Sequence, residues 1–133
     1  MLRILIVEDE PVNRELLLLS LRGLGECTAV ATGEDAVLAQ QRALEQNQPF
    51  DVVFLDIMLP GMDGLQALEQ LRALEDRHQV PQDKRVPVII TTGLDDDQTA
   101  SRAFIQGQAL SYMTKPFRTG QISEELRKLR LIA

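Results

Sequence analysis

Short apolar runs alternate with helical patterns along the whole chain, and this alternation limits the fold more than any other feature. The apolar runs are rich in strand-forming residues and cover residues 3–7, 27–31, 51–55, 86–91 and 110–113. Strands that alternate with helices pair in parallel through right-handed crossovers, and the helices cover both faces of the sheet. We therefore expect an α/β fold, a doubly wound (βα)5 three-layer sandwich around a five-stranded parallel sheet.

The helical segments are predicted from the spacing of apolar residues. In the first segment Val12, Leu16 and Leu19 recur at i, i+4 and i+7, the spacing of a helical apolar face, and Gly25 lies beyond its end. The polar stretch 76–85 is predicted as a loop. Further helices are predicted around Ala36, Leu68, Ala103 and Leu126.

The composition indicates one globular domain. A chain of 133 residues with 44% hydrophobic residues fits a single domain, residues 1–133, with no effector domain. The net charge of -6 argues against direct binding to nucleic acid, which requires clustered basic residues. The single cysteine, Cys27, excludes an internal disulfide. No signal peptide or membrane span is recognised, so we expect a cytoplasmic protein with no membrane partner.

Polar side chains follow the apolar runs where the predicted strands end. The carboxyl ends of parallel strands lie at one edge of a sheet, so these side chains are expected to converge on one site. They are Glu8 and Asp9 after the first run, Asp56 after the third, Thr91 and Thr92 after the fourth, and Lys115 after the fifth.

Adjacent carboxylates at a sheet edge suit a hard divalent cation such as Mg²⁺. For Glu8, Asp9 and Glu10 alone, solvated loop charges or a cap by Asp9 on the following helix are equally acceptable explanations. Asp56 favours the metal, because a carboxylate after four apolar residues needs a partner. Such an aspartate can also attack phosphorus and form an acyl phosphate. Mg²⁺, Lys115 and the Thr92 hydroxyl would then each contact one phosphoryl oxygen.

Four segments together resemble the receiver domain of two-component response regulators, the CheY-like family. They are ILIVEDEP at 4–11, DVVFLDIMLPGMDG at 51–64, PVIITTG at 87–93 and YMTKPF at 112–117, in the family's order. The resemblance covers essentially the whole chain and implies a CheY/flavodoxin-like fold. It implies a phosphoprotein of a two-component system or phosphorelay, which accepts a phosphoryl group from a histidine kinase or a histidine phosphotransfer protein. The reaction would depend on Mg²⁺ or Mn²⁺.

The resemblance also implies a role for each residue of the metal and phosphoryl site. Asp56 would be the phosphoacceptor and a metal ligand, and Asp9 a direct ligand. Glu8 would hold a metal-bound water, and the backbone carbonyl of Met58 would be the third protein ligand. Lys115 would pair with Asp56 and then with the phosphate, through a Lys115–Pro116 peptide bond that is expected to be cis.

The resemblance further implies a conformational switch. Thr92 would move toward the phosphoryl group, and the ring of Tyr112 would turn inward into the space that Thr92 leaves. The responding surface is expected over residues 98–131 and would bind an unknown output protein. The protein would be a monomer or a phosphorylation-dependent dimer. It would catalyse its own phosphoryl transfer and autodephosphorylation without being a conventional turnover enzyme.

Two positions bear on the lifetime of the phosphorylated form. Met58 and Leu94 flank the route by which water would attack the acyl phosphate. Both side chains are apolar, so neither can orient a water molecule. We therefore hypothesise a long-lived phosphoryl state.

The sequence pattern has three alternative interpretations. The chain could be a receiver domain excised from a hybrid kinase or a larger multidomain regulator, although the start at Met1 favours a complete protein or an N-terminal domain. An aspartate-nucleophile phosphatase of the haloacid dehalogenase type needs an acid two residues after the nucleophile, where Met58 stands. A flavodoxin-like flavin binder needs a hydroxyl- and glycine-rich phosphate loop, but Glu8 and Asp9 would repel a phosphate.

Overall fold

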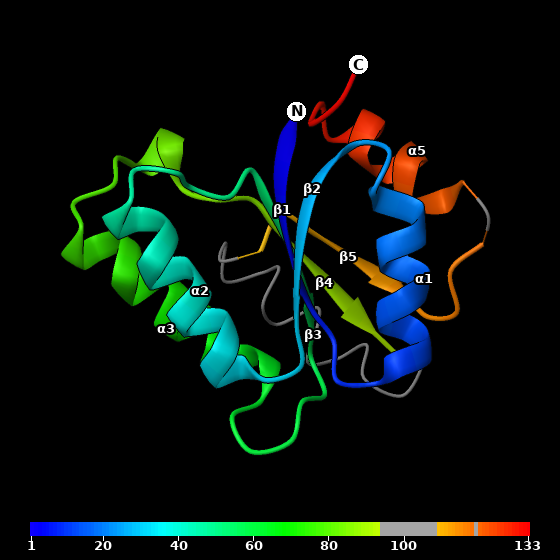
Figure 1. The fold of residues 1–133 in the computed structure, drawn as a ribbon, viewed down its shortest axis with the longest axis horizontal. Coiled ribbons are helices and arrows are strands. Elements are labelled where there is room, and N and C mark those ends of the chain that lie inside the picture. The colour runs from blue at the N-terminus through cyan, green and yellow to red at the C-terminus, as the bar shows by residue number, and fades with distance from the viewer. Residues whose placement is uncertain (94–108, 119) are drawn as a thin grey trace.

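The computed structural model of the chain describes residues 1–93, 109–118 and 120–133. Five parallel strands form one sheet in the order β2-β1-β3-β4-β5 (Figure 1). The strands are β1 (Leu2–Val7), β2 (Gly25–Val30), β3 (Val52–Asp56), β4 (Val88–Thr92) and β5 (Ser111–Thr114). The helices are α1 (Pro11–Leu21), α2 (Gly33–Glu45), α3 (Gly64–Arg77) and α5 (Gln121–Lys128), with a 3₁₀ turn at Gln82–Lys84. The predicted doubly wound parallel sheet is confirmed, and the helix predicted around Ala103 lies outside the described residues.

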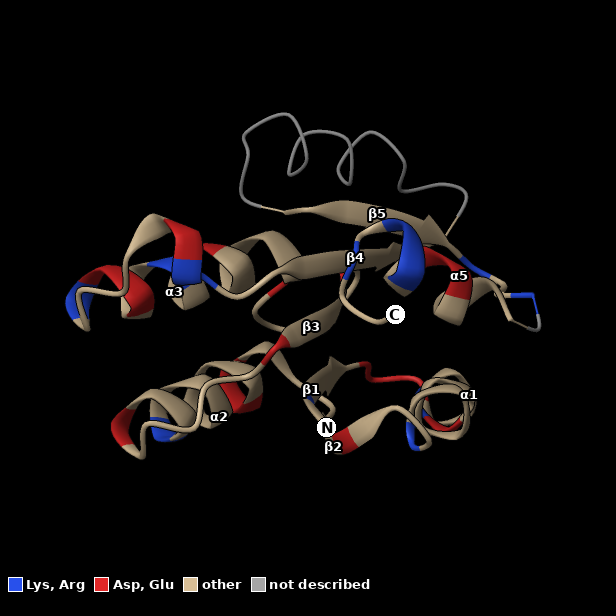
Figure 2. Ribbon diagram, turned by 90° about the horizontal axis from the view of Figure 1, so that it is seen from above, with Lys and Arg blue, Asp and Glu red and all other residues tan. Residues whose placement is uncertain are grey.

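The sheet is the middle of three layers, because its strands are apolar on both faces. Helices α1 and α5 cover one face, and α2 and α3 cover the other (Figures 1 and 2). Successive strand residues alternate between the two cores: Phe54 of β3 packs on the α1/α5 side and Leu55 on the α2/α3 side. This alternation fixes the face on which the polar residues beyond each strand lie.

The apolar stripe that predicted α1 lies on the outer face of that helix. Val12 is 65% exposed, and Leu16 and Leu19 are each 48% exposed, whereas Leu17 and Leu21 are fully buried against the sheet. The helix has leucine at four consecutive positions, so the spacing was compatible with more than one face. The stripe of Val12, Leu16 and Leu19, here called the α1 stripe, therefore remains available on the surface.

Gly25 lies beyond the end of α1, as predicted, but two predicted element boundaries differ in the structure: β2 begins before residue 27, and α3 extends past residue 76. Gly25 begins β2, where a Cβ atom would lie 2.3 Å from the carbonyl oxygen of Leu2, so this glycine allows two strands to approach closely. Helix α3 continues to Arg77, inside the stretch predicted as a loop, because its last turns bury Leu74 and Glu75. Within the described parts of the chain, no helix has the length and apolarity needed to cross a membrane.

Candidate functional site

The predicted charged residues meet at the carboxyl edge of the sheet. Ile6, Phe54 and Met113 all pack on the α1/α5 side. Strand alternation therefore sends Glu8 and Lys115, each two residues further along, toward the same side as Asp56. Figure 2 shows the acidic loop that joins β1 to α1 at this edge.

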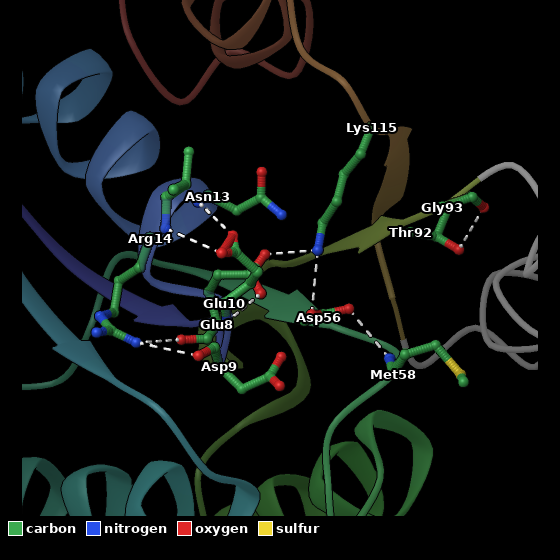
Figure 3. A network of polar contacts seen from close by, with 11 residues as sticks. Glu8, Asp9, Glu10, Asn13, Arg14, Asp56, Met58, Thr92, Gly93 and Lys115 are labelled. Carbon is green, nitrogen blue, oxygen red and sulfur yellow. Dashed lines mark hydrogen bonds and ion pairs between the residues drawn. The ribbon is translucent and has the colours of Figure 1, made fainter.

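Lys115 links two buried carboxylates. Its Nζ lies 2.5 Å from Glu8 Oε1 and 3.1 Å from Asp56 Oδ2 (Figure 3). The backbone N–H of Met58 donates to Asp56 Oδ1 at 3.0 Å, and that of Glu10 donates to Glu8 Oε2 at 3.2 Å. Both carboxylates are therefore held from two sides, and the ammonium sits between them.

The acidic residues fit a divalent cation. Carboxylate oxygens of Glu8, Asp9 and Asp56 all lie within 4.8 Å of one another. Glu8 and Asp56 are buried and Asp9 is exposed, so the cluster opens to solvent on one side. Among residues 1–93, 109–118 and 120–133, Lys115 is the one cation that forms an ion pair with this cluster, so negative charge is in excess there. Hard oxygen ligands of this kind suit Mg²⁺.

Burial shifts the ionisation of the ion pair. It raises the pKa of Glu8 to about 7, and the nearby Asp56 carboxylate adds to the increase, while Lys115 opposes it. Burial alone would lower the pKa of Lys115, but Glu8 and Asp56 outweigh this effect and raise it. The lysine therefore stays charged, and Glu8 is the group whose charge depends on what else occupies the site.

Helix α1 begins with a cap that was not predicted. The side chain of Glu10, not of Asp9, accepts from the N–H groups of Val12 and Asn13, at 3.3 and 3.2 Å. The capping explanation for Asp9 is therefore wrong, and its carboxylate is left to the metal cluster. Glutamate is an uncommon cap, and its place before Pro11 at the start of the helix was the only signal.

Arg14 is a site residue that sequence reasoning missed. Its Nη1 donates to the backbone oxygens of Glu8 and Asp9 at 3.0 and 3.4 Å (Figure 3). It thereby fixes the loop that carries two predicted metal ligands. The one sequence feature that could have indicated this role is the position of Arg14, one turn into the helix that follows the acidic loop.

The loop after β3 is held close to the site by a glycine. At Gly64, a Cβ atom would lie 2.4 Å from the carbonyl oxygen of Asp56. The Gly64 N–H also donates to Ile57 O at 3.0 Å. Asp63 and Gln66 form a capping box at the start of α3. The loop that contains Met58 is therefore held by hydrogen bonds where it leaves β3 and where it enters α3.

The predicted switch residues lie beside the site. The Thr92 hydroxyl donates to the carbonyl oxygen of Gly93 at 3.1 Å and is not directed at Asp56 (Figure 3). Tyr112 is exposed on β5. The Lys115–Pro116 peptide bond is cis, as predicted. Leu94, and residues 98–108 and 119 of the predicted output surface, lie outside the described residues.

Comparison with known proteins gives a consistent set of relatives. The sequence model of the family described as response regulator receiver domain matches residues 4–127. The sensor histidine kinase GacS of Pseudomonas protegens is 34% identical over 128 residues, which make up 95% of this chain and 13% of that kinase. The two-component response regulator ORR41 of Oryza sativa subsp. japonica is 30% identical and is matched over 96% of its length and 98% of this chain. The chain spans about half or less of the length of the first curated relatives it matches.

A solved structure has the same fold over nearly the whole chain. The receiver domain of the sensor histidine kinase PA1611 from Pseudomonas aeruginosa PAO1 is 33% identical, with a TM-score of 0.75. The match covers 96% of this chain and 95% of that domain. That structure contains a magnesium ion coordinated in its active-site cleft.

Proposed function

The chain belongs to the response regulator receiver domain family and receives signals in a two-component system; on that basis we propose that Asp56 is its phosphoacceptor. The observation that carries this proposal is the pairing of Lys115 with two buried carboxylates, Glu8 and Asp56, next to the exposed Asp9. This arrangement combines a nucleophile, a fixed cation and a set of metal ligands. We further propose that residues 1–133 form a single receiver domain.

The transfer uses the Asp56 carboxylate as nucleophile toward a phosphohistidine of the partner. A carboxylate oxygen forms the new O–P bond, the P–N bond breaks, and its electron pair returns to the imidazole ring. The Lys115 ammonium, whose Nζ lies 3.1 Å from Asp56 Oδ2, then pairs with a phosphoryl oxygen as negative charge develops there. A bound Mg²⁺, held by Asp9, Asp56 and the Met58 carbonyl and through water by Glu8, would offset the remaining charge.

The phosphoryl donor is a histidine kinase or a histidine phosphotransfer protein. The α1 stripe supports this choice, because it presents exposed apolar side chains on the helix that directly follows Glu8, Asp9 and Glu10. A partner that covers the stripe would bring its histidine to the open side of the acidic cluster. Apolar contact there would supply affinity without adding charge to the site.

The output is a change of protein-binding surface. The new phosphoryl group carries about 1.5 to 2 negative charges, and the Thr92 hydroxyl can leave Gly93 O and donate to it. Tyr112 then turns from its exposed position toward the space that Thr92 vacates. The altered surface includes β5 and α5 and binds an output protein, either as a monomer or as a dimer that forms on phosphorylation.

Phosphorylation of the purified protein tests this function. With acetyl phosphate and Mg²⁺ or Mn²⁺, the wild type gains one phosphoryl group by intact mass, and Asp56→Asn gains none. Asp51→Asn is the matched control, because Asp51 directly precedes the same strand at its other end, where its carboxylate accepts from Arg3 N at 2.7 Å. Incorporation that survives Asp56→Asn would contradict the proposal.

A further inference from the structure

Thr91 is a strand-end hydroxyl to which the proposed function gives no role. The residue is fully buried, with 0% of its surface exposed. Its Oγ1 has no hydrogen-bond partner within the described residues. A buried hydroxyl without a partner destabilises a fold, and valine would fill the same space without that cost. The hydroxyl is therefore available to a hydrogen-bond donor that the described resting contacts do not supply.

The register of the sheet places Thr91 beside the phosphoacceptor. Thr91 of β4 pairs with Asp56 of β3 on one side and with Met113 of β5 on the other. Paired residues of neighbouring parallel strands project to the same face. Ile89, two residues before Thr91, packs with Phe54 on the α1/α5 side. The Thr91 side chain therefore shares its face with Asp56.

The lysine side chain has to cross the strand that carries Thr91. Lys115 follows β5, its ammonium pairs with Asp56 at the end of β3, and β4 lies between these strands. Neighbouring strands are about 4.8 Å apart, so the side chain spans the width of β4 on the face where Thr91 lies. Figure 3 shows Lys115 extended across the site toward Asp56. The hydroxyl of Thr91 thus lies beneath the path of the lysine.

We infer that Thr91 is a positioning residue whose hydroxyl accepts a hydrogen bond from the Lys115 ammonium in the phosphorylated state. An ammonium has three N–H donors, and Lys115 directs two of them to Glu8 and Asp56 in the resting protein. In the acyl phosphate the Asp56 oxygens no longer carry a full charge, and the ammonium moves onto the phosphoryl group. Thr91 then holds the lysine from below and stabilises the phosphorylated state over the resting one. This inference rests on the proposed phosphorylation of Asp56.

Three substitutions separate the hydroxyl from the volume of the side chain. Thr91→Val removes the hydroxyl and keeps the shape, Thr91→Ser keeps the hydroxyl, and Thr28→Val makes the same chemical change on the edge strand β2. Beryllofluoride with Mg²⁺ serves as a stable stand-in for the phosphoryl group. The measurements are the melting temperature without metal and the affinity for beryllofluoride at saturating Mg²⁺.

The two measurements should move in opposite directions. Thr91→Val should raise the melting temperature by a few degrees, because the resting hydroxyl has no partner in the part of the chain that the structure describes. The same substitution should weaken beryllofluoride binding about tenfold. Thr91→Ser should bind beryllofluoride within about twofold of the wild type. Thr28→Val should leave the affinity unchanged. A residue that acts only in packing would not combine higher stability with weaker binding.

Each other result overturns the inference. If Thr91→Val binds beryllofluoride as tightly as the wild type, the hydroxyl has no role, and the proposed function is unaffected. If Thr91→Ser is as weak as Thr91→Val, the loss comes from packing. If Thr91→Val does not fold, Thr91→Ala replaces it and must bind less tightly than Thr91→Ser. If the wild type itself takes up neither beryllofluoride nor phosphate, the proposed function fails and the inference fails with it.

Discussion

Glu8 is the residue at which burial and charge oppose each other most directly. Its side chain is fully buried, yet the site requires its carboxylate to be negative when a cation binds. Burial raises its pKa from 4.5 to about 7, so between these pH values the metal-free protein keeps Glu8 protonated. A cation at the site has to displace that proton.

Mg²⁺ affinity should therefore depend on pH in the neutral range. Because a proton is released on binding below about pH 7, affinity should rise by up to about tenfold per pH unit up to that point and then level off. Glu8→Gln should bind Mg²⁺ more weakly, with a flatter pH dependence. Calorimetric titration at pH 6, 7 and 8, in two buffers of different ionisation enthalpy, measures both the affinity and the released proton. Equal wild-type affinity at pH 6 and pH 8 would show that Glu8 keeps its charge without the metal.

The side chain of Met58 should set the lifetime of the phosphorylated state. It is exposed beside Asp56 and cannot orient a water molecule, so hydrolysis of the acyl phosphate should be slow. Met58→Gln should shorten the half-life about tenfold, because an amide can position the attacking water. Met58→Leu is the matched control and should keep the wild-type half-life. A wild-type half-life of seconds would refute the hypothesis, and loss of radioactive phosphate after removal of the donor measures it.

The site could be predicted from residues whose type and position carry the chemistry. Asp56 and Lys115 are charged groups at the ends of apolar strands, and a parallel sheet brings such ends together without further information. Arg14 and Glu10 were missed because they act through the backbone, as donor to loop carbonyls and as helix cap. Charged residues on an exposed helix turn have many possible partners, and only the folded loop selects one.

At the scale of elements, the approach of α3 to the end of β3 depends on one glycine. Gly64→Ala would place a Cβ atom 2.4 Å from the Asp56 carbonyl oxygen, a backbone atom that can yield only if the strand end moves. We expect a loss of about 2 kcal/mol in the free energy of unfolding. Phosphorylation should also slow, since Asp56 and the loop after it would shift. Urea denaturation and the initial rate with acetyl phosphate measure the two effects.

Gly23→Ala is the matched control for that change. A Cβ atom at Gly23 would meet nothing within 4 Å, so the substitution should be neutral or slightly stabilising. If both variants lose the same stability, the effect at Gly64 would come from general loss of glycine flexibility and not from the close approach. If Gly64→Ala is neutral, the loop accommodates the methyl group, and the site does not depend on this contact.

The elements themselves show where sequence patterns stop being informative. The strands were predicted because an apolar run buried on both faces has few alternatives. For α1, the run Leu16 to Leu19 supplies apolar residues to every side of the helix, so the pattern fits several faces. The packing of Leu17 and Leu21 against the sheet determines which face of α1 is buried, and that packing depends on residues distant in the sequence. The unused leucines then form the α1 stripe.

At the scale of the whole molecule, the carboxyl ends and the amino ends of the strands have different roles. At the carboxyl ends, the carboxylates of Glu8, Asp9 and Asp56 lie close together. Their mutual repulsion favours cation binding and lowers the stability of the fold. Near the amino ends, buried Glu75 accepts from the Val86 N–H and from Arg72 Nη1, each at 2.7 Å. Arg72 Nη1 also donates to Val86 O at 2.9 Å, so this network ties α3 to the segment that leads into β4. Changes in the Glu75 network should therefore lower the free energy of unfolding without affecting phosphorylation at Asp56.

Glu75→Ala tests this separation. The substitution leaves the Val86 N–H and the Arg72 guanidinium without their carboxylate, and we expect a loss of about 3 kcal/mol in the free energy of unfolding. The initial rate of phosphorylation, measured well below the melting temperature, should stay within about twofold of the wild type, because Asp56 and Lys115 keep their geometry at the carboxyl ends of the strands. Glu69→Ala, an exposed change on the same helix, should alter neither quantity. If phosphorylation falls in a fully folded Glu75→Ala protein, the two ends of the strands are coupled through α3, and the carboxyl ends cannot be treated as an independent site.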